Sequence, residues 1–140
     1  MENRDVEAIL AIQSASPEIA QWSMADYVRA AQGEMVGWVA DEDIGIIGFL
    51  VARQIANEIE ILNFAVRQGA RGKGVGASLL REAFSWAKAL GAIRAFLEVR
   101  ASNSAALRFY EHQGFAVTGR RPRYYADPVE DALVLAAPLH

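Results

Sequence analysis

The chain has 140 residues, 53% of them hydrophobic, and a formal net charge of −3. This length can bury one core but is too short for two ordinary domains, so a single domain spanning residues 1–140 is expected. The absence of cysteine excludes disulfides, thiolate metal sites and a cysteine nucleophile, and with only two histidines no metal site is predicted.

The sequence contains neither a membrane span nor a recognisable export signal. Its longest apolar run, near residues 132–139, is much shorter than a bilayer requires, and the N-terminus is acidic and polar. We therefore expect a soluble cytoplasmic protein that does not insert into a membrane. The slightly negative net charge also argues against direct nucleic-acid binding.

Hydrophobic periodicity and turn residues divide the chain into helices and strands. The first half is expected to contain helices at 5–15 and 23–32 and strands at 35–41, 45–54 and 57–66. The second half is expected to contain helices at 74–90 and 104–113 and strands at 94–99, 115–121 and 131–136. This order predicts an α/β fold, with a mixed, mostly antiparallel sheet and helices on both faces. The side chains expected in the core are Trp38, Phe49, Ile61 and Leu97.

A glycine-rich loop joins the strand at 57–66 to the helix at 74–90. Its residues are Arg71, Gly72, Lys73, Gly74, Val75, Gly76 and Ala77. Glycine lets the backbone turn tightly and approach a ligand, and the first amides of the following helix have no partners within the helix. Such a helix start binds anions readily, so a pyrophosphate could lie there.

Other families use similar loops. A P-loop needs four residues between its first glycine and Gly-Lys, followed by Ser or Thr, whereas Lys73 is followed by Gly74, so that pattern fails. A dinucleotide loop stays open, because Ala77 is an allowed variant and Glu98 lies at about the right distance for a ribose-binding acid. For the loop alone, a plain glycine-rich turn with solvated charges is an equally good explanation.

The segments that follow the next strand make the sequence recognisable. Residues 97–103 read LEVRASN, residues 109–111 read FYE and residues 114–115 read GF. Together with the glycine loop they resemble the GNAT N-acetyltransferase superfamily and, within it, the RimI type, which acetylates the N-terminal alanine of protein eighteen of the small ribosomal subunit. The similarity extends to WS at 22–23, RYY at 123–125 and EDA at 130–132, so it covers almost the whole chain.

The resemblance implies a GNAT fold with acetyl-CoA as the donor and a protein N-terminus, in the RimI type a ribosomal one, as the acceptor. The donor would lie on the glycine loop and between splayed strand ends, along Phe64, Ala65 and Val66. The Val66 amide would then stabilise negative charge on the thioester oxygen. By the same resemblance Tyr124 and Tyr125 would line the peptide groove, although aromatic packing on the sheet also explains them.

The chain departs from the family pattern in two places. Only residues 1–4 precede the first expected helix, so the usual opening edge strand is expected to be missing. Gly72 stands where RimI-like sequences often carry arginine, which removes one cation near the pyrophosphate. Lys73 either contacts a phosphate or stays solvated, while Asn103 could contact CoA and also cap the helix that it precedes.

Glu98 is the candidate general base. An α-amino group with a pKa of about 8 is roughly one-tenth neutral at pH 7, whereas a lysine near 10.4 requires roughly 3.3 kcal/mol more for deprotonation. An N-terminal amine is thus the easier substrate for a modest base. A carboxylate near the end of its strand could accept the ammonium proton directly or through water. The alternative is that Glu98 pairs with Arg100 or is a solvated edge residue.

Tyr110 is the candidate acid. A phenol with a pKa near 10 can donate a hydrogen bond or a proton as charge develops on the departing CoA sulfur, which resembles a thiol with a pKa of about 8.5. The alternative is that Tyr110 packs beside Phe109. Direct transfer without an acetyl-enzyme is expected; a small-amine or lysine acetyltransferase of the same fold, or a CoA-binding sensor without catalysis, are the alternatives.

Overall fold

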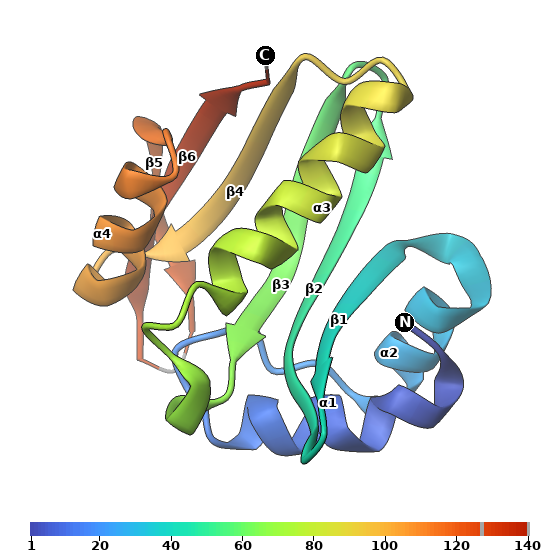
Figure 1. The fold of residues 1–140 in the computed structure, drawn as a ribbon. Helices are drawn as coiled ribbons and strands as arrows, with labels where there is room; N and C mark the ends of the chain where they lie inside the picture. The colour runs from blue at the N-terminus through green and yellow to red at the C-terminus, as the bar shows by residue number, and fades with distance from the viewer. Residues whose placement is uncertain (127, 140) are drawn as a thin grey trace.

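The computed structural model describes residues 1–126 and 128–139. Within these residues, six strands form one sheet in the order β1-β2-β3-β4-β6-β5 (Figure 1). The strands are β1 (Val36–Glu42), β2 (Gly45–Ile55), β3 (Glu58–Val66), β4 (Arg94–Arg100), β5 (Ala116–Tyr125) and β6 (Glu130–Pro138). Only β3 and β4 run parallel, and the other neighbouring strands are antiparallel. The expected mixed, mostly antiparallel sheet is confirmed.

Four α-helices pack on this sheet within the described residues, joined by short helical turns. The helices are α1 (Val6–Ser14), α2 (Met24–Arg29), α3 (Val75–Ala89) and α4 (Ser104–His112), and the turns are η1 (Asn3–Asp5), η2 (Ala30–Glu34) and η3 (Gln68–Ala70). In the described part of the chain no strand precedes α1, as expected. None of these helices is both long and apolar enough to cross a membrane.

The second helix is shorter than the sequence predicts. It begins at a capping box, in which Ser23 Oγ accepts from the Asp26 amide at 3.2 Å and Asp26 Oδ2 accepts from the Ser23 amide at 3.0 Å. The α-helix ends at Arg29 and a wider turn continues it. Gly33 then takes a φ of 100°, a left-handed conformation that ends helices and favours glycine.

Strand β5 is longer than expected. The sequence predicts a strand ending at residue 121, just before Pro122. In the structure β5 is the edge strand and pairs only with β6, and an edge strand tolerates a proline that has no amide hydrogen to donate. The register shifts between Arg121 and Tyr125, and Arg123 has a φ of 53°, so the strand continues through a bulge.

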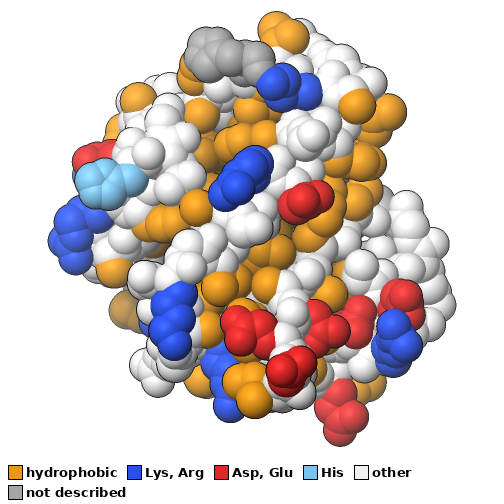
Figure 2. Space-filling view, in the orientation of Figure 1, with side chains coloured by type: hydrophobic (Ala, Val, Ile, Leu, Met, Phe, Trp, Pro, Cys, Tyr) orange, Lys and Arg blue, Asp and Glu red, His pale blue; other side chains and the backbone are white. Residues whose placement is uncertain are grey.

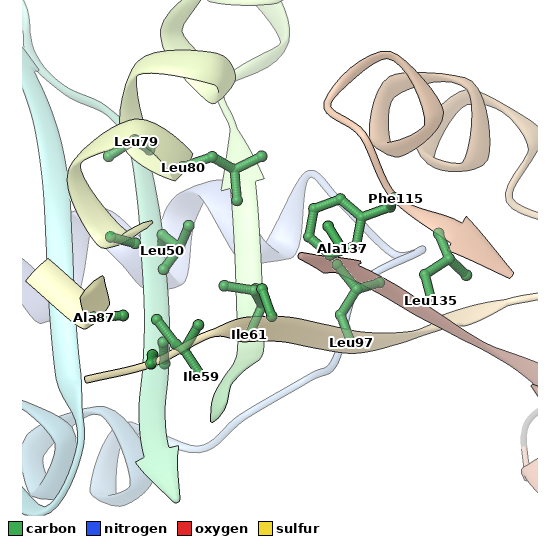
Figure 3. Close-up of a cluster of buried hydrophobic side chains, with 14 of the residues drawn as sticks. Leu50, Ile59, Ile61, Leu79, Leu80, Ala87, Leu97, Phe115, Leu135 and Ala137 are labelled. Atoms are coloured by element: carbon green, nitrogen blue, oxygen red, sulfur yellow. The ribbon is translucent and has the colours of Figure 1, made fainter. Parts of the chain in front are cut away.

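Two hydrophobic cores lie on opposite faces of the sheet. In β2, the Leu50 side chain belongs to the core under α3 and α4, whereas Phe49 and Val51 belong to the core under α1 and α2. This alternation follows from the two-residue period of a strand. Figure 3 shows side chains from α3, among them Leu79 and Leu80, over the sheet in the first core.

The core positions predicted from the sequence are largely correct. Phe49, Ile61 and Leu97 are 0%, 6% and 2% exposed, respectively. Trp38 is half-buried and packs against the first core, with its ring 5.5 Å from that of Trp86.

Strand β3 changes its pairing at a bulge. Ala52 of β2 pairs with Ile61 and Val51 pairs with Asn63, so Leu62 is an extra residue. The β3–β4 ladder stops at the pair of Ile61 and Leu97. The sheet therefore opens beyond this pair, and the bulge re-aims the last β3 side chains.

Candidate active site

A cleft of about 1160 Å³ lies where β3 and β4 separate. Its walls come from the ends of both strands, the glycine loop, the first turn of α3, α4, the end of β5 and the segment between α1 and α2. Apart from Lys73, all the site residues predicted from the sequence line this cleft. Segments that are distant in the chain, from the residues between α1 and α2 to the end of β5, thus meet where the sheet opens.

Lys73 faces elsewhere. It lines a separate hollow of about 510 Å³ between β1 and α3, together with Asp41, Glu42 and Glu82. Acidic side chains gather on the lower part of the face drawn in Figure 2. Lys73 thus shares this acidic hollow with Gly74 and Val75 of the glycine loop and does not line the cleft that holds the other predicted residues.

The glycine loop takes the conformation expected of an anion-binding turn. Gly72 and Gly74 have φ values of 78° and 83°, which side-chain-bearing residues rarely adopt. Gly74 precedes α3 without a side-chain cap, and the first helical bond runs from the Ser78 amide to its carbonyl at 3.0 Å. The amides of the first turn therefore remain free to bind an anionic group.

Gly76 is required for a close approach of elements. A Cβ atom there would lie 3.1 Å from Phe109 Cζ and 3.3 Å from Phe64 Cζ. The two rings themselves pack edge to face, with centroids 5.9 Å apart. The absence of a side chain thus lets the first turn of α3 lie against the aromatic floor of the cleft.

Arg71 bridges two walls of the cleft. Its Nε donates to the Val66 carbonyl at 2.9 Å, and its Nη2 donates to Ser16 Oγ at 3.2 Å and to Glu18 Oε1 at 3.3 Å. The guanidinium expected near the phosphates is therefore engaged with the segment between α1 and α2. The contacts with Ser16 and Glu18 are invisible in the sequence, because both residues lie more than fifty positions from Arg71.

Glu98 lies at the point where the β3–β4 ladder ends. Its neighbours Leu97 and Val99 belong to the core under α3, so by strand alternation the Glu98 side chain lies on the α1/α2 face. Glu98 Oε1 forms an ion pair with Arg121 Nε at 3.1 Å, and the side chain is only 15% exposed. Within the described residues no hydrogen bond of ordinary geometry reaches its buried Oε2.

The alternative interpretation of Glu98, an ion pair with Arg100, is wrong. Arg100 pairs with Glu130 at 3.2 Å and leaves Glu98 to Arg121. The same Glu130 accepts from the Ser102 amide at 2.8 Å, which ties β6 to the loop before α4. Arg121 was not singled out from the sequence, and no local pattern marks it.

Tyr110 lies in an aromatic cluster on the α3/α4 side of the cleft. Its ring centroid is 5.3 Å from that of Phe109, 5.4 Å from that of Phe115 and 6.2 Å from that of Phe64. Burial among protein atoms raises the pKa of Tyr110 well above its usual value. No described residue forms a hydrogen bond with its hydroxyl, so packing fixes the ring and leaves the polar group available.

The hairpin of β5 and β6 carries the two predicted groove tyrosines. Tyr124 and Tyr125 pack edge to face at 5.1 Å, and Arg100 lies 4.3 Å from the Tyr125 ring centroid. Hydrogen bonding with Glu98 is the main cause that raises the pKa of Tyr124. Burial, and then the charge of Glu98, raise the pKa of Tyr125 to about 12. The Glu98 carboxylate thus raises the pKa of both phenols.

Two more polar side chains line the cleft. Asn103 Oδ1 accepts from the Ala106 amide at 3.2 Å, which confirms the expected N-cap of α4. Glu60, which the sequence analysis did not single out, lines the same cleft and pairs with Arg53 at 2.8 Å. The described residues contain no group of three or more His, Cys, Asp or Glu side chains that could hold a metal ion.

Comparison with known proteins assigns the fold. Residues 6–115 match the model of the acetyltransferase (GNAT) family. The chain belongs to this family. The expected GNAT fold, with an opened mixed sheet and helices on both faces, is confirmed.

Curated relatives support the RimI-type resemblance. The chain is 27% identical over 141 residues to the ribosomal protein bS18-alanine N-acetyltransferase of Escherichia coli (strain K12), covering 99% of this chain and 95% of that protein. It is 33% identical over 99 residues to the protein of the same name from Salmonella typhimurium, covering 69% of this chain and 67% of that protein.

Solved structures agree with this placement. The crystal structure of the ribosomal-protein-S18-alanine N-acetyltransferase from Escherichia coli aligns with a TM-score of 0.85 at 26% identity, covering 99% of this chain and 90% of that one. Ard1 from Thermoplasma volcanium aligns with a TM-score of 0.87 at 27% identity, covering 100% of this chain and 95% of that one.

Proposed function

We propose that this protein transfers the acetyl group of acetyl-CoA to the N-terminal α-amine of a protein in the cytoplasm. The proposed acceptor is the N-terminal alanine of a small-subunit ribosomal protein; the relatives from Escherichia coli and Salmonella typhimurium are named as acetyltransferases of an alanine of ribosomal protein bS18. The chain shares almost its full length with the first of these relatives.

The α3/α4 side of the cleft suits the donor. The uncapped first turn of α3 and the left-handed glycines Gly72 and Gly74 offer amides to a pyrophosphate. The gap between β3 and β4 suits the pantetheine arm, next to the backbone of Phe64, Ala65 and Val66. Acetyl-CoA bound there supplies a thioester carbonyl, and the Val66 amide is the proposed donor to its oxygen.

The α1/α2 side of the cleft suits the acceptor. Glu98 lies at the strand opening, and Tyr124 and Tyr125 flank it from the β5–β6 hairpin. A peptide lying between this hairpin and the segment between α1 and α2 would bring its ammonium group to the carboxylate. Glu98 takes the first ammonium proton, the freed nitrogen bonds to the acetyl carbon, and the carbon–sulfur bond breaks; the second proton that the nitrogen loses on becoming an amide passes to the departing sulfur, so that CoA leaves as a thiol.

Tyr110 serves the leaving group as a hydrogen-bond donor. A phenol near pKa 10 is a weaker acid than a thiol near 8.5 by about 1.5 units, so complete proton transfer to the sulfur costs about 2 kcal/mol. Burial raises the pKa of Tyr110 further. The hydroxyl therefore stays protonated and stabilises the charge on the sulfur without giving up its proton.

A single observation carries the proposal: the buried Oε2 of Glu98 belongs to the cleft lining and has no hydrogen bond of ordinary geometry among the described residues, although the nearby Tyr124 hydroxyl interacts with the same carboxylate. A buried carboxylate oxygen without a partner is unfavourable. An acceptor ammonium at this position would satisfy it, which makes the same atom both binding group and base.

Mass spectrometry of peptides incubated with acetyl-CoA tests this function. The panel contains an alanine-first ribosomal peptide, the same sequence with a blocked N-terminus and an internal lysine, and a polyamine. We expect one acetyl group on the free alanine and none on the blocked peptide. Acetylation of the lysine or the polyamine alone would contradict the acceptor, and acetyl-CoA binding without transfer to any amine would contradict catalysis.

A further inference from the structure

Three polar side chains are buried together on the α1/α2 face of the sheet. Gln13 of α1, Tyr27 of α2 and Asn63 of β3 are 6%, 0% and 4% exposed. Polar groups at such depth are unfavourable unless hydrogen bonds satisfy them. The Tyr27 ring also fills space in the core under α1 and α2, so the hydrogen-bond partners of the three polar groups, and not their burial, indicate what these groups do.

The Tyr27 hydroxyl joins the other two side chains. It donates to Gln13 Oε1 and accepts from Asn63 Nδ2, the latter at 2.8 Å. The connection therefore spans three elements that are separate in the sequence. Desolvation by burial raises the pKa of Tyr27, which keeps the hydroxyl protonated for the bond that it donates.

The two amides carry this connection to the backbone of residues 20–22. Gln13 Nε2 donates to the Trp22 carbonyl at 2.9 Å, and Gln13 Oε1 accepts from the Trp22 amide at 3.0 Å. Asn63 Nδ2 donates to the Ala20 carbonyl at 3.0 Å. The Tyr27 ring also lies 5.2 Å from that of Trp22. The network therefore replaces the regular hydrogen bonds that a helix or strand would give this stretch.

Residues 20–22 are part of the cleft wall, whereas Gln13 and Tyr27 are not. The wall faces Glu98 and the β5–β6 hairpin across the opening, on the side that the proposed function gives to the acceptor. Asn63 also accepts from the Phe64 amide at 3.1 Å. The network thus links the acceptor wall to the β3 bulge, and of its three side chains only Asn63 lines the cleft.

We propose that Tyr27 is a positioning residue that acts through Gln13 and Asn63 to hold residues 20–22 in place for acceptor binding. This rests on the proposed function, which makes that wall part of the acceptor site. A tyrosine-to-phenylalanine change removes the bridging oxygen and keeps the ring that packs on Trp22. The wall then loses its order, while the glycine loop and α3 stay as they are.

Two variants and one control test the proposal. Tyr27→Phe removes the bridge, and Gln13→Met removes the amide at similar side-chain length. Gln54→Met is the matched control, because Gln54 Nε2 also ties a backbone carbonyl, that of Leu90 at 2.9 Å, at the far end of α3. Each protein is measured for amide hydrogen exchange at Trp22, for acceptor KM and for acetyl-CoA Kd.

Tyr27→Phe and Gln13→Met should speed exchange at Trp22 by about tenfold and raise the acceptor KM roughly three- to tenfold, with acetyl-CoA Kd unchanged. Gln54→Met should leave all three quantities as in the wild type. Wild-type exchange at Trp22 in both variants, or faster exchange with an unchanged acceptor KM, would overturn the proposal. Failure of the wild type to acetylate peptides counts against the proposed function instead, because the exchange experiment needs no substrate.

Discussion

Arg121 Nε lies 3.1 Å from Glu98 Oε1 and holds the carboxylate by one oxygen, while the other oxygen is buried in the cleft without a hydrogen bond of ordinary geometry among the described residues. The two residues come from β4 and β5, which are not adjacent strands, since β6 lies between them. One charged contact across a strand therefore orients the proposed base. A carboxylate held at one end keeps its second oxygen in a fixed direction, which favours proton transfer.

Arg121→Gln should lower kcat for the alanine-first peptide about three- to tenfold and leave acetyl-CoA Kd unchanged, because the carboxylate keeps its position but loses its orientation. Steady-state kinetics with both substrates measure this effect. Arg120→Gln is the matched control, since Arg120 pairs with Asp131 and lies outside the cleft lining. Equal kinetics in the two variants would dismiss the orienting role.

Tyr110→Phe should lower kcat by about ten- to a hundredfold, because the departing sulfur loses its hydrogen-bond donor. The ring keeps its contacts with Phe64, Phe109 and Phe115, so the free energy of unfolding should change by less than about 0.5 kcal/mol. Rates of thiol release and chemical denaturation measure the two quantities. A wild-type rate of thiol release in this variant would show that Tyr110 serves packing alone.

Gly76→Ala should weaken acetyl-CoA binding about three- to tenfold and destabilise the fold by about 1 kcal/mol. The new Cβ would press on the rings of Phe109 and Phe64 at 3.1 and 3.3 Å, so that either these rings or the first turn of α3 must shift by a few tenths of an ångström. Calorimetric titration with acetyl-CoA measures the affinity. Gly69→Ala, where nothing lies within 4 Å of the added atom, should behave as the wild type, and equal affinities in the two variants would argue against the packing effect.

Alkaline pH should destabilise the protein through Tyr27. Burial raises the pKa of Tyr27 in the folded state above its ordinary value near 10, so above pH 10 the unfolded chain loses this proton first. The stability that the protonated Tyr27 hydroxyl contributes to the folded state is fully present below pH 10. It falls by about 1.4 kcal/mol per pH unit as the pH rises towards the folded-state pKa. Denaturant titrations at several pH values between about 9 and 11 measure the free energy of unfolding. This free energy should fall less steeply with pH in Tyr27→Phe than in the wild type; an identical pH dependence would contradict this assignment.

Much of the fold and part of the site could be predicted because the signals are local. The alternation of β3, the glycines before α3 and the Asn103 cap depend on residues a few positions apart, and local conformation decides them. The separation of the β3 and β4 ends was expected from the resemblance to the GNAT superfamily. Strand β5 continues past the expected end through Pro122, which an edge strand tolerates, and the sequence does not show that this strand is at the edge.

The polar connections of the site could not be predicted from the sequence. Arg71 reaches Ser16 across 55 residues, and Tyr27 reaches Asn63 across 36. Glu98 and Arg100 are two apart on one strand and suggest an ion pair, yet Glu130 on the neighbouring strand takes Arg100. Such choices depend on which side chains the finished fold brings within reach, and several partners of equal charge are present in this sequence.

The most direct test of the account is the turnover of Glu98→Gln with saturating acetyl-CoA and an alanine-first peptide, beside Glu60→Gln. Glu60 is the matched control, because its carboxylate lines the same cleft but is held by Arg53 at 2.8 Å. We predict that Glu98→Gln lowers kcat by about a hundredfold or more with unchanged acetyl-CoA Kd, and that Glu60→Gln stays within about threefold of the wild type. Wild-type turnover in Glu98→Gln would contradict the central claim that this carboxylate accepts the proton of the acceptor amine.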